Sequence, residues 1–259
     1  MTTYPHLQIS SPIIWVALAH RFGFGIIVPF YYIAYVYPSN VEPYWWPLSR
    51  EVPTHYAKCI LLATMMGYVL PAILNLVSRT SSIQDYAASW QMLPLSIPLL
   101  ALLSSRIYTT VKPIKNTGTP DAADKPKDLD YLKIIYFFTF VISLRLHITT
   151  IFNVLTSETL TLRSAFFPSF ISHIPPTVDT TLRDFYLVDF WIFALATYGW
   201  CVNAVWDIKR VGRTTISVGV AAVVLLSAVI MVGPGATIVG CWYWRELAMS
   251  KTSVTRKAA

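Results

Sequence analysis

The segment YLKIIYFFTFVISLRLHITTIFNV, Tyr131–Val154, is apolar along nearly its whole length, and its only basic side chains are Lys133, Arg145 and His147. A run of this length matches the ~20 residues that an α-helix needs to cross the hydrocarbon core of a bilayer. Arg145 and His147 lie deep within the run. The segment therefore predicts a transmembrane helix that carries polar side chains into the membrane.

The rest of the chain repeats this apolar character. The 259 residues are 55% hydrophobic and 13% charged, with a mean hydropathy of +0.53, whereas soluble domains carry about 25% charged residues. This composition excludes an ordinary soluble enzyme. Further spans are predicted at Ser11–Tyr35, Tyr56–Val77, Ala87–Ser104, Leu187–Val205 and Thr214–Trp244, with a weaker one at Arg163–Ile174. We expect an all-α polytopic membrane bundle of about seven transmembrane helices, forming one domain over residues 1–259.

Basic residues predict the orientation. Two polar segments stand out, a flexible loop over 105–130 and a short tail over 245–259. If Arg163–Ile174 crosses the membrane, most basic loop residues share one side, and Arg79, Arg163, Lys209, Arg210 and Arg213 face the other. If Arg163–Ile174 instead enters and leaves the membrane on the same side, the numbers of basic loop residues on the two sides become nearly equal. Basic loops favour the cytoplasm, so we expect a luminal N-terminus and a cytoplasmic C-terminus in the endoplasmic reticulum. The net charge of +7 then fits anionic lipid headgroups and requires no nucleic acid.

Ionisable residues inside spans are costly and mark polar interiors or functional sites. His20 and Arg21 lie near the middle of the first span, at a depth similar to that of Arg145 and His147. These two basic pairs are therefore expected to line one cavity, helped by a helix distortion at Gly23, Gly25 and Pro29. Its expected luminal rim holds polar side chains from several loops: Asn75, Arg79, Asp85, Asn153, Glu158, Asn203 and Asp207. In an alternative interpretation, the buried arginines pair with carboxylates and only hold helices together.

Several chemistries lose support from the sequence. Cys59, Cys201 and Cys241 are scattered, without the spacing of a disulfide framework or of a zinc site. The motifs GxxxxGK[ST], GxGxxG, HExxH, GxSxG and the aspartate clusters that bind magnesium diphosphate are missing. We therefore expect acid–base chemistry without a metal or cofactor, or no catalysis.

Three stretches resemble the small membrane-bound terpene cyclases of fungal secondary metabolism, in the family named for the ascofuranone cyclase. They are REVPTHYAKCILLATMMGYVLPAIL (Arg50–Leu74), SLRLHITTIFN (Ser143–Asn153) and DFWIFALATYGWCVNAVWDIKR (Asp189–Arg210). The resemblance implies protonation of an epoxide, followed by attack of an internal alkene, a hydroxyl or water on the carbon that develops positive charge. Related members act on polyketide polyenes. The paired carboxylates of paxilline-type membrane cyclases do not align here, so the resemblance assigns no catalytic residue.

The residues themselves are compatible with this chemistry. A carboxylic acid in a low-dielectric site can protonate an epoxide, and a second carboxylate or a histidine can accept the proton of the nucleophile. We expect Glu158 and Asp207 to form the acid–base pair, with Asp189, near the predicted cytoplasmic edge of its span, as a further candidate. The expected substrate-binding residues are His20, Arg21, Arg145, His147, Asn153, Asp85 and Asn203.

The function predicted from the sequence is therefore the opening of an epoxide on a lipophilic meroterpenoid or polyketide, by cyclisation or by hydrolysis. The expected partners are this substrate, membrane lipid and an upstream epoxidising monooxygenase. The alternative is a non-catalytic lipid-binding or scaffold protein of the membrane. A small transporter or a seven-helix receptor is disfavoured because the chain is short and shows no inverted repeat.

Overall fold

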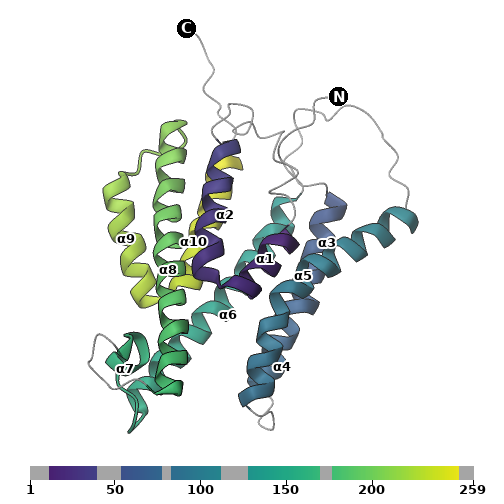
Figure 1. Ribbon diagram of the computed structural model, residues 1–259. Helices are drawn as coiled ribbons and strands as arrows, with labels where there is room; N and C mark the ends of the chain where they lie inside the picture. The colour runs from purple at the N-terminus through teal and green to yellow at the C-terminus, as the bar shows by residue number, and fades with distance from the viewer. Residues whose placement is uncertain (1–11, 40–53, 78–82, 112–127, 170–176, 251–259) are drawn as a thin grey trace.

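The computed structural model describes residues 12–39, 54–77, 83–111, 128–169 and 177–250 (Figure 1). The elements in these ranges are all helical, which confirms the all-α prediction. They are α1 (Pro12–Phe22), α2 (Phe24–Ser39), α3 (Thr54–Thr64), the π-helix η4 (Met65–Val69), α4 (Leu70–Val77), α5 (Ile83–Val111), α6 (Leu129–Thr156), α7 (Leu162–Phe166), α8 (Val178–Arg210), α9 (Val218–Met231) and α10 (Pro234–Ser250).

Two of these helices, α6 and α8, are long and apolar enough to cross a membrane. Only 6% of the most apolar stretch of α6 and 22% of that of α8 is buried inside the protein, whereas the core helix of a soluble protein is mostly buried. The number of seven transmembrane helices stays a prediction.

The first predicted span is divided into two helices. α1 ends at Phe22 and α2 begins at Phe24, and Gly23 between them has a φ of +97°. A residue with a Cβ rarely adopts this left-handed conformation, so glycine allows the chain to break here. The distortion expected from Gly23, Gly25 and Pro29 therefore falls at Gly23.

The last predicted span, Thr214–Trp244, is wrong as a single helix, because α9 and α10 form a hairpin (Figure 1). α9 ends where the Val232 N–H donates to the Ala228 carbonyl at 2.8 Å. Gly233 follows with a φ of +89°, and Pro234 begins α10. A glycine in the left-handed conformation typically ends a helix, and a proline is favoured at the first position of the next one.

The weak span over Arg163–Ile174 is also wrong as far as the structure describes it. α7 covers only Leu162–Phe166, about 8 Å at 1.5 Å per residue, and Pro168 disfavours a helical conformation at the residue before it. Residues 170–174 lie outside the described residues. The predicted loop and tail both begin too early, since α5 continues to Val111 and α10 continues to Ser250.

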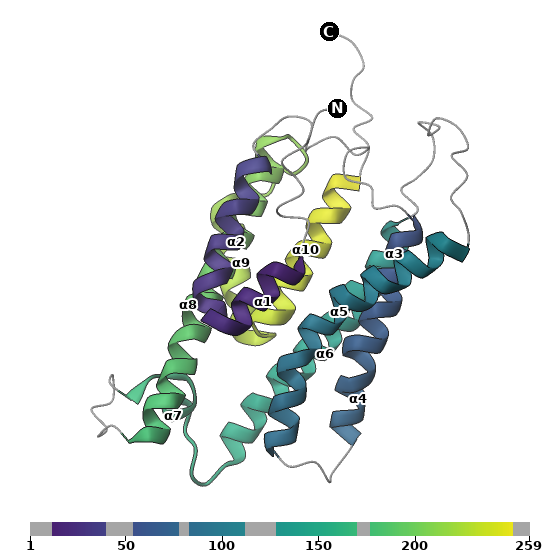
Figure 2. The same cartoon turned by 45° about the vertical axis from the view of Figure 1, so that its right-hand side comes forward.

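α8 is the long helix on which α2, α9 and α10 pack (Figures 1 and 2). A second group consists of α5 packed on α3 and η4. α6 contacts α10 on one side and α3 on the other, and α1 contacts α2 and α5, so these two helices join the groups. A buried cluster of Trp200, Cys201, Ala204 and Cys241 lies between α8 and α10.

Gly233→Ala is expected to lower the thermal unfolding midpoint in detergent. Its Cβ would lie 2.6 Å from Cγ of His147 and would also have to tolerate the positive φ. Gly199→Ala is the matched control, because its Cβ would meet no atom within 4 Å and alanine favours a helix over glycine by up to about 1 kcal/mol. A similar midpoint for both variants would contradict the importance of the Gly233 turn.

Candidate functional site

The most polar buried site of the described residues lies where the C-terminal turns of α8 meet α10. Asp207 is 9% exposed and Arg245 is 2% exposed. Both line a small internal cavity of about 10 Å³, together with Tyr35, Trp200 and Asn203. We call Asn203, Asp207, Arg245 and Glu246 the Asp207 cluster.

The periodicity of α8 places three of the side chains that line this cavity on one face of the helix. Trp200, Asn203 and Asp207 are separated by three and four residues, the spacing that stacks side chains along one side of a helix. The Asn203 amide donates to Asp207 at 3.5 Å, and Arg210 forms an ion pair with Asp207 at 3.3 Å. The carboxylate of Asp207 is therefore held by neighbours on its own helix.

α10 contributes the second carboxylate. Nη1 of Arg245 lies 3.1 Å from Oε1 of Glu246, and its guanidinium lies 5.0 Å from the ring centroid of Trp242. Asp207 and Glu246 thus flank a buried arginine. Glu246 was not predicted as a site residue and Arg245 was assigned to a loop, because the last predicted span ends at Trp244. Ala248 and Met249, both buried, continue the apolar pattern and could have indicated the longer helix.

Four aromatic side chains form one side of the site, and we call them the aromatic wall: Tyr32, Tyr35, Trp200 and Trp242. The rings of Trp200 and Trp242 stack at 4.1 Å between centroids, and Tyr32 stacks on Trp200 at 5.3 Å. Tyr35 meets the edges of both tryptophans at 5.9 Å. Such ring faces carry negative charge and attract cations, so the wall can stabilise positive charge on a bound molecule.

The structure does not bring Glu158 beside Asp207. Glu158 is exposed after the end of α6. The segment that follows is tied to the first half of α8, because Nε1 of Trp191 donates to the Phe166 carbonyl at 2.7 Å. Asp207 lies sixteen residues further along α8, about 24 Å at 1.5 Å per residue. The expected pairing of Glu158 with Asp207 is therefore not observed.

The two basic pairs do not share one cavity either. Arg145 and Arg21 are exposed, and Arg21 lies 5.8 Å from the ring of Phe22. His20 is partly buried, and its Nε2 has no hydrogen-bond partner. His147 contacts the Ile230 carbonyl at 3.0 Å and lines a groove of about 690 Å³ whose walls contain none of the other three. The two pairs are apart because α1 packs on α2 and α5, whereas α6 packs on α10 and α3.

The remaining expected residues are placed as follows. Asn153 is exposed at the end of α6. Asp189 lies within α8, where its carboxylate accepts hydrogen bonds from two backbone N–H groups of α2. The side chains of Asn75 and Asp85, and the whole of Arg79, lie outside the described residues. Sequence analysis did not select Asp184, which is buried and accepts hydrogen bonds from the backbone N–H and the hydroxyl of Ser169. These bonds hold the segment after α7 against α8.

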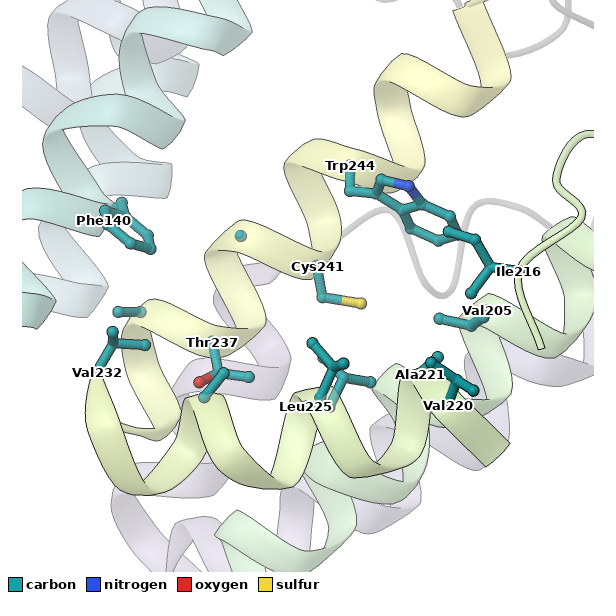
Figure 3. Close-up of a pocket in the computed structure, with 14 residues that line it drawn as sticks. Phe140, Val205, Ile216, Val220, Ala221, Leu225, Val232, Thr237, Cys241 and Trp244 are labelled. Atoms are coloured by element: carbon teal, nitrogen blue, oxygen red, sulfur yellow. The ribbon is translucent and has the colours of Figure 1, made fainter. Parts of the chain in front are cut away.

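A separate apolar cavity of about 590 Å³ lies between α8, α9 and α10 (Figure 3), and it shares no lining residue with the small cavity at Asp207. Phe140 of α6 closes one end, and Val205, two residues before Asp207, lies at the other. The sulfur of Cys241, the hydroxyl of Thr237 and the indole nitrogen of Trp244 are the polar atoms among the side chains labelled there. A cavity with this lining suits a hydrocarbon chain.

Comparison with known proteins identifies relatives along the whole chain. The CtvD domain profile matches residues 5–250. The FAD-dependent monooxygenase atnA of Arthrinium sp is 23% identical over 94% of this chain, and ntnA of Nectria sp, with the same description, is 24% identical over 94%. The FAD-dependent monooxygenase verC1 of Penicillium polonicum is 26% identical over 86%. No solved structure gives a significant match.

The chain spans only about 30% of the length of these relatives. Their names include FAD, but the residues described here do not fit that cofactor. A dinucleotide is commonly held by a strand, a glycine-rich turn and a helix, whereas the described residues form helices and the sequence has no GxGxxG. The match therefore covers only part of each relative, and in this chain the described residues of that part are helical.

Proposed function

Because the chain belongs to the CtvD domain family, we propose that it is a membrane-embedded acid–base enzyme of fungal secondary metabolism. In this proposal it opens an epoxide on a lipophilic meroterpenoid or polyketide. The observation that carries the proposal is the Asp207 cluster, in which a buried carboxylate lines a small cavity together with Tyr35 and Trp200 of the aromatic wall.

The names of the relatives support the choice of an epoxide. A flavin-dependent monooxygenase inserts one oxygen atom from O₂ into its substrate, and an epoxide is the product when that substrate is an alkene. The helical segment accounts for about 30% of each such relative. A module that consumes an epoxide is useful next to an enzyme that makes one. In this proposal, a separate flavin monooxygenase supplies the substrate of this chain.

The proposed reaction uses Asp207 as the proton donor. Its protonated carboxyl transfers the proton to the epoxide oxygen as one carbon–oxygen bond breaks, which leaves a hydroxyl group and positive charge on carbon. A nucleophile then bonds to that carbon and loses its proton to a carboxylate. Either Asp207 itself, now ionised, or Glu246 across Arg245 accepts this proton. When Glu246 accepts this proton, it returns the proton to Asp207 before the next turnover, so the enzyme is regenerated on either route.

The surroundings favour this sequence of events. Arg245 lines the same cavity as Asp207 and can stabilise the negative charge that the Asp207 carboxyl gains when it gives up its proton. The rings of the aromatic wall can stabilise the developing cation, and the apolar cavity between α8, α9 and α10 can hold a hydrocarbon part of the substrate. The nucleophile determines the product: an internal alkene or hydroxyl gives a cyclic isomer, and water gives a diol.

We propose an orientation for the end of the bundle at which α8 and α10 end. In Figure 1, the C-terminal ends of α5, α8 and α10 lie at the same end of the bundle as the start of α6. The described basic residues near these ends are Arg106, Lys133, Lys209, Arg210, Arg213 and Arg245. Because α7 does not cross, Lys209–Arg213 join this basic end, and Arg183 at the start of α8 lies opposite. The positive-inside rule then places the basic end in the cytoplasm, with the endoplasmic reticulum as the proposed membrane.

The proposal is tested with membranes that contain this protein. They are incubated, without added metal or cofactor, with an epoxidised lipophilic polyene and with an epoxyfarnesyl aromatic compound, and the products are analysed by mass spectrometry. A product of unchanged mass and altered retention time indicates cyclisation, and a gain of one water indicates hydrolysis. Folded protein that converts neither substrate contradicts the proposal and favours a lipid-binding or scaffolding role.

A further inference from the structure

Asp189 lies in the interior of α8 rather than at its edge. The sequence analysis placed it two residues into a span that starts at Leu187, but α8 begins at Val178. Asp189 is therefore eleven residues from the start of the helix, about 17 Å along its axis. A partly buried carboxylate at this depth requires strong hydrogen-bond donors.

Those donors are the first backbone N–H groups of α2. The Gly25 N–H donates to Oδ1 of Asp189 at 2.8 Å, and the Phe24 N–H donates to Oδ2 at 3.2 Å. The first N–H groups of a helix have no partner within the helix, and a carboxylate there is favoured by the helix dipole. Asp189 thus caps α2 from another helix, in the way that an N-cap side chain normally does from its own chain segment.

The backbone fits closely at the same point. A Cβ on Gly25 would lie 2.7 Å from the Asp189 carbonyl oxygen, and a Cβ on Gly23 would lie 2.5 Å from Oδ1 of Asp189. Both glycines let α2 approach α8 until the two hydrogen bonds form. The contact therefore fixes the axial position of α2 on α8, rather than only adding stability.

The same two helices carry most of the aromatic wall. Tyr32 lies two turns after Gly25 on α2, and Trp200 lies three turns after Asp189 on α8. Beyond the capped end, the Tyr32 and Thr197 hydroxyls lie 3.1 Å apart, and the Tyr32 ring stacks on Trp200. A shift of α2 along α8 would break this stacking.

We propose that Asp189 is a positioning residue, which holds α2 in the register that builds the aromatic wall beside the Asp207 cluster. The expected effect of Asp189 on turnover rests on the proposed epoxide opening, whereas its expected effect on the positions of the rings in the aromatic wall does not. Asp189 transfers no proton in this role. Its partners are backbone amides, and Asp207 lies eighteen residues further along α8, about 27 Å at 1.5 Å per residue.

The test compares Asp189→Ala, Asp189→Asn and Gly25→Ala in the full chain. The stacked tryptophans give a near-ultraviolet circular dichroism signal, and the part of it that disappears in Trp200→Phe is assigned to them. The strength of that signal measures whether the aromatic wall is intact. We expect Asp189→Ala and Gly25→Ala to weaken this signal and to lower kcat roughly 100-fold, since a displacement of about 1 Å can have that effect. Asp189→Asn keeps acceptor oxygen and retains most of the signal, with a loss of about tenfold or less. Asp179→Asn, an exposed acid in the first turn of α8, is the control.

Two results would overturn the positioning role. One is an unchanged tryptophan signal in both Asp189→Ala and Gly25→Ala. The other is complete loss of turnover in Asp189→Asn with the signal intact, which would indicate a catalytic carboxylate. If the wild-type protein converts no epoxide, the proposed function fails, yet the spectroscopic comparison still decides whether Asp189 positions α2.

Discussion

Asp207→Asn removes epoxide opening while the protein still folds and inserts into membranes. The amide keeps the size and the hydrogen-bonding capacity of the carboxyl group but cannot donate a proton as an acid, so we expect kcat to fall roughly 10²- to 10⁴-fold. The protein fraction in membranes and the near-ultraviolet circular dichroism should match the wild type. The measurement is the initial rate of product formation, followed by mass spectrometry.

Two comparison variants make this result specific. Asp130→Asn changes an exposed acid that pairs only with Lys133 on the surface of α6, and it should keep the wild-type rate. Glu246→Gln tests the second carboxylate, and we expect an intermediate loss because Asp207 can reclaim the proton. Glu158→Gln distinguishes the two pairings. We expect it to keep the wild-type rate, whereas loss of activity in both Glu158→Gln and Asp207→Asn would favour the pair Glu158–Asp207 that the sequence predicts.

Arg245→Met has the largest expected effect on stability. Arg245 is 2% exposed and lies between Glu246 and the ring of Trp242. Methionine fills similar space but removes the cation from the partly buried Glu246, while Asp207 keeps its ion pair with Arg210. Breaking a buried ion pair on one side costs about 3–5 kcal/mol. We expect the unfolding midpoint in detergent to fall by roughly 10 °C.

A second substitution distinguishes charge from packing. In the double variant Arg245→Met with Glu246→Gln, one uncompensated carboxylate is removed, so part of the lost stability should return. Arg163→Met, at an exposed position of α7, serves as the control and should change stability by no more than about 0.5 kcal/mol. If Arg245→Met behaves like this control, the buried arginine does not hold the cluster together.

Among the expected site residues, the sequence was most informative about Asp207. Its position two residues after Val205, near the end of an apolar run and next to Asn203, indicated a polar site at the end of a helix, and Asp207 is buried beside Asn203 as such a site requires. Its partner was not predictable in the same way. Glu246 comes from α10, and only the packing of α10 on α8 brings the two helices together.

The sequence by itself determined the helical class and the apolar character of the surface, because hydrophobic runs and their lengths are local properties of the chain. It also signalled the break at Gly23, which depends on the conformational freedom of a single residue. Only the tertiary structure decided that Thr214–Trp244 folds back at Gly233 and that Asp189 caps α2. It likewise placed Glu158 far from Asp207. These features depend on contacts between helices that are distant in sequence, and hydrophobic patterns along one helix carry no information about its neighbours.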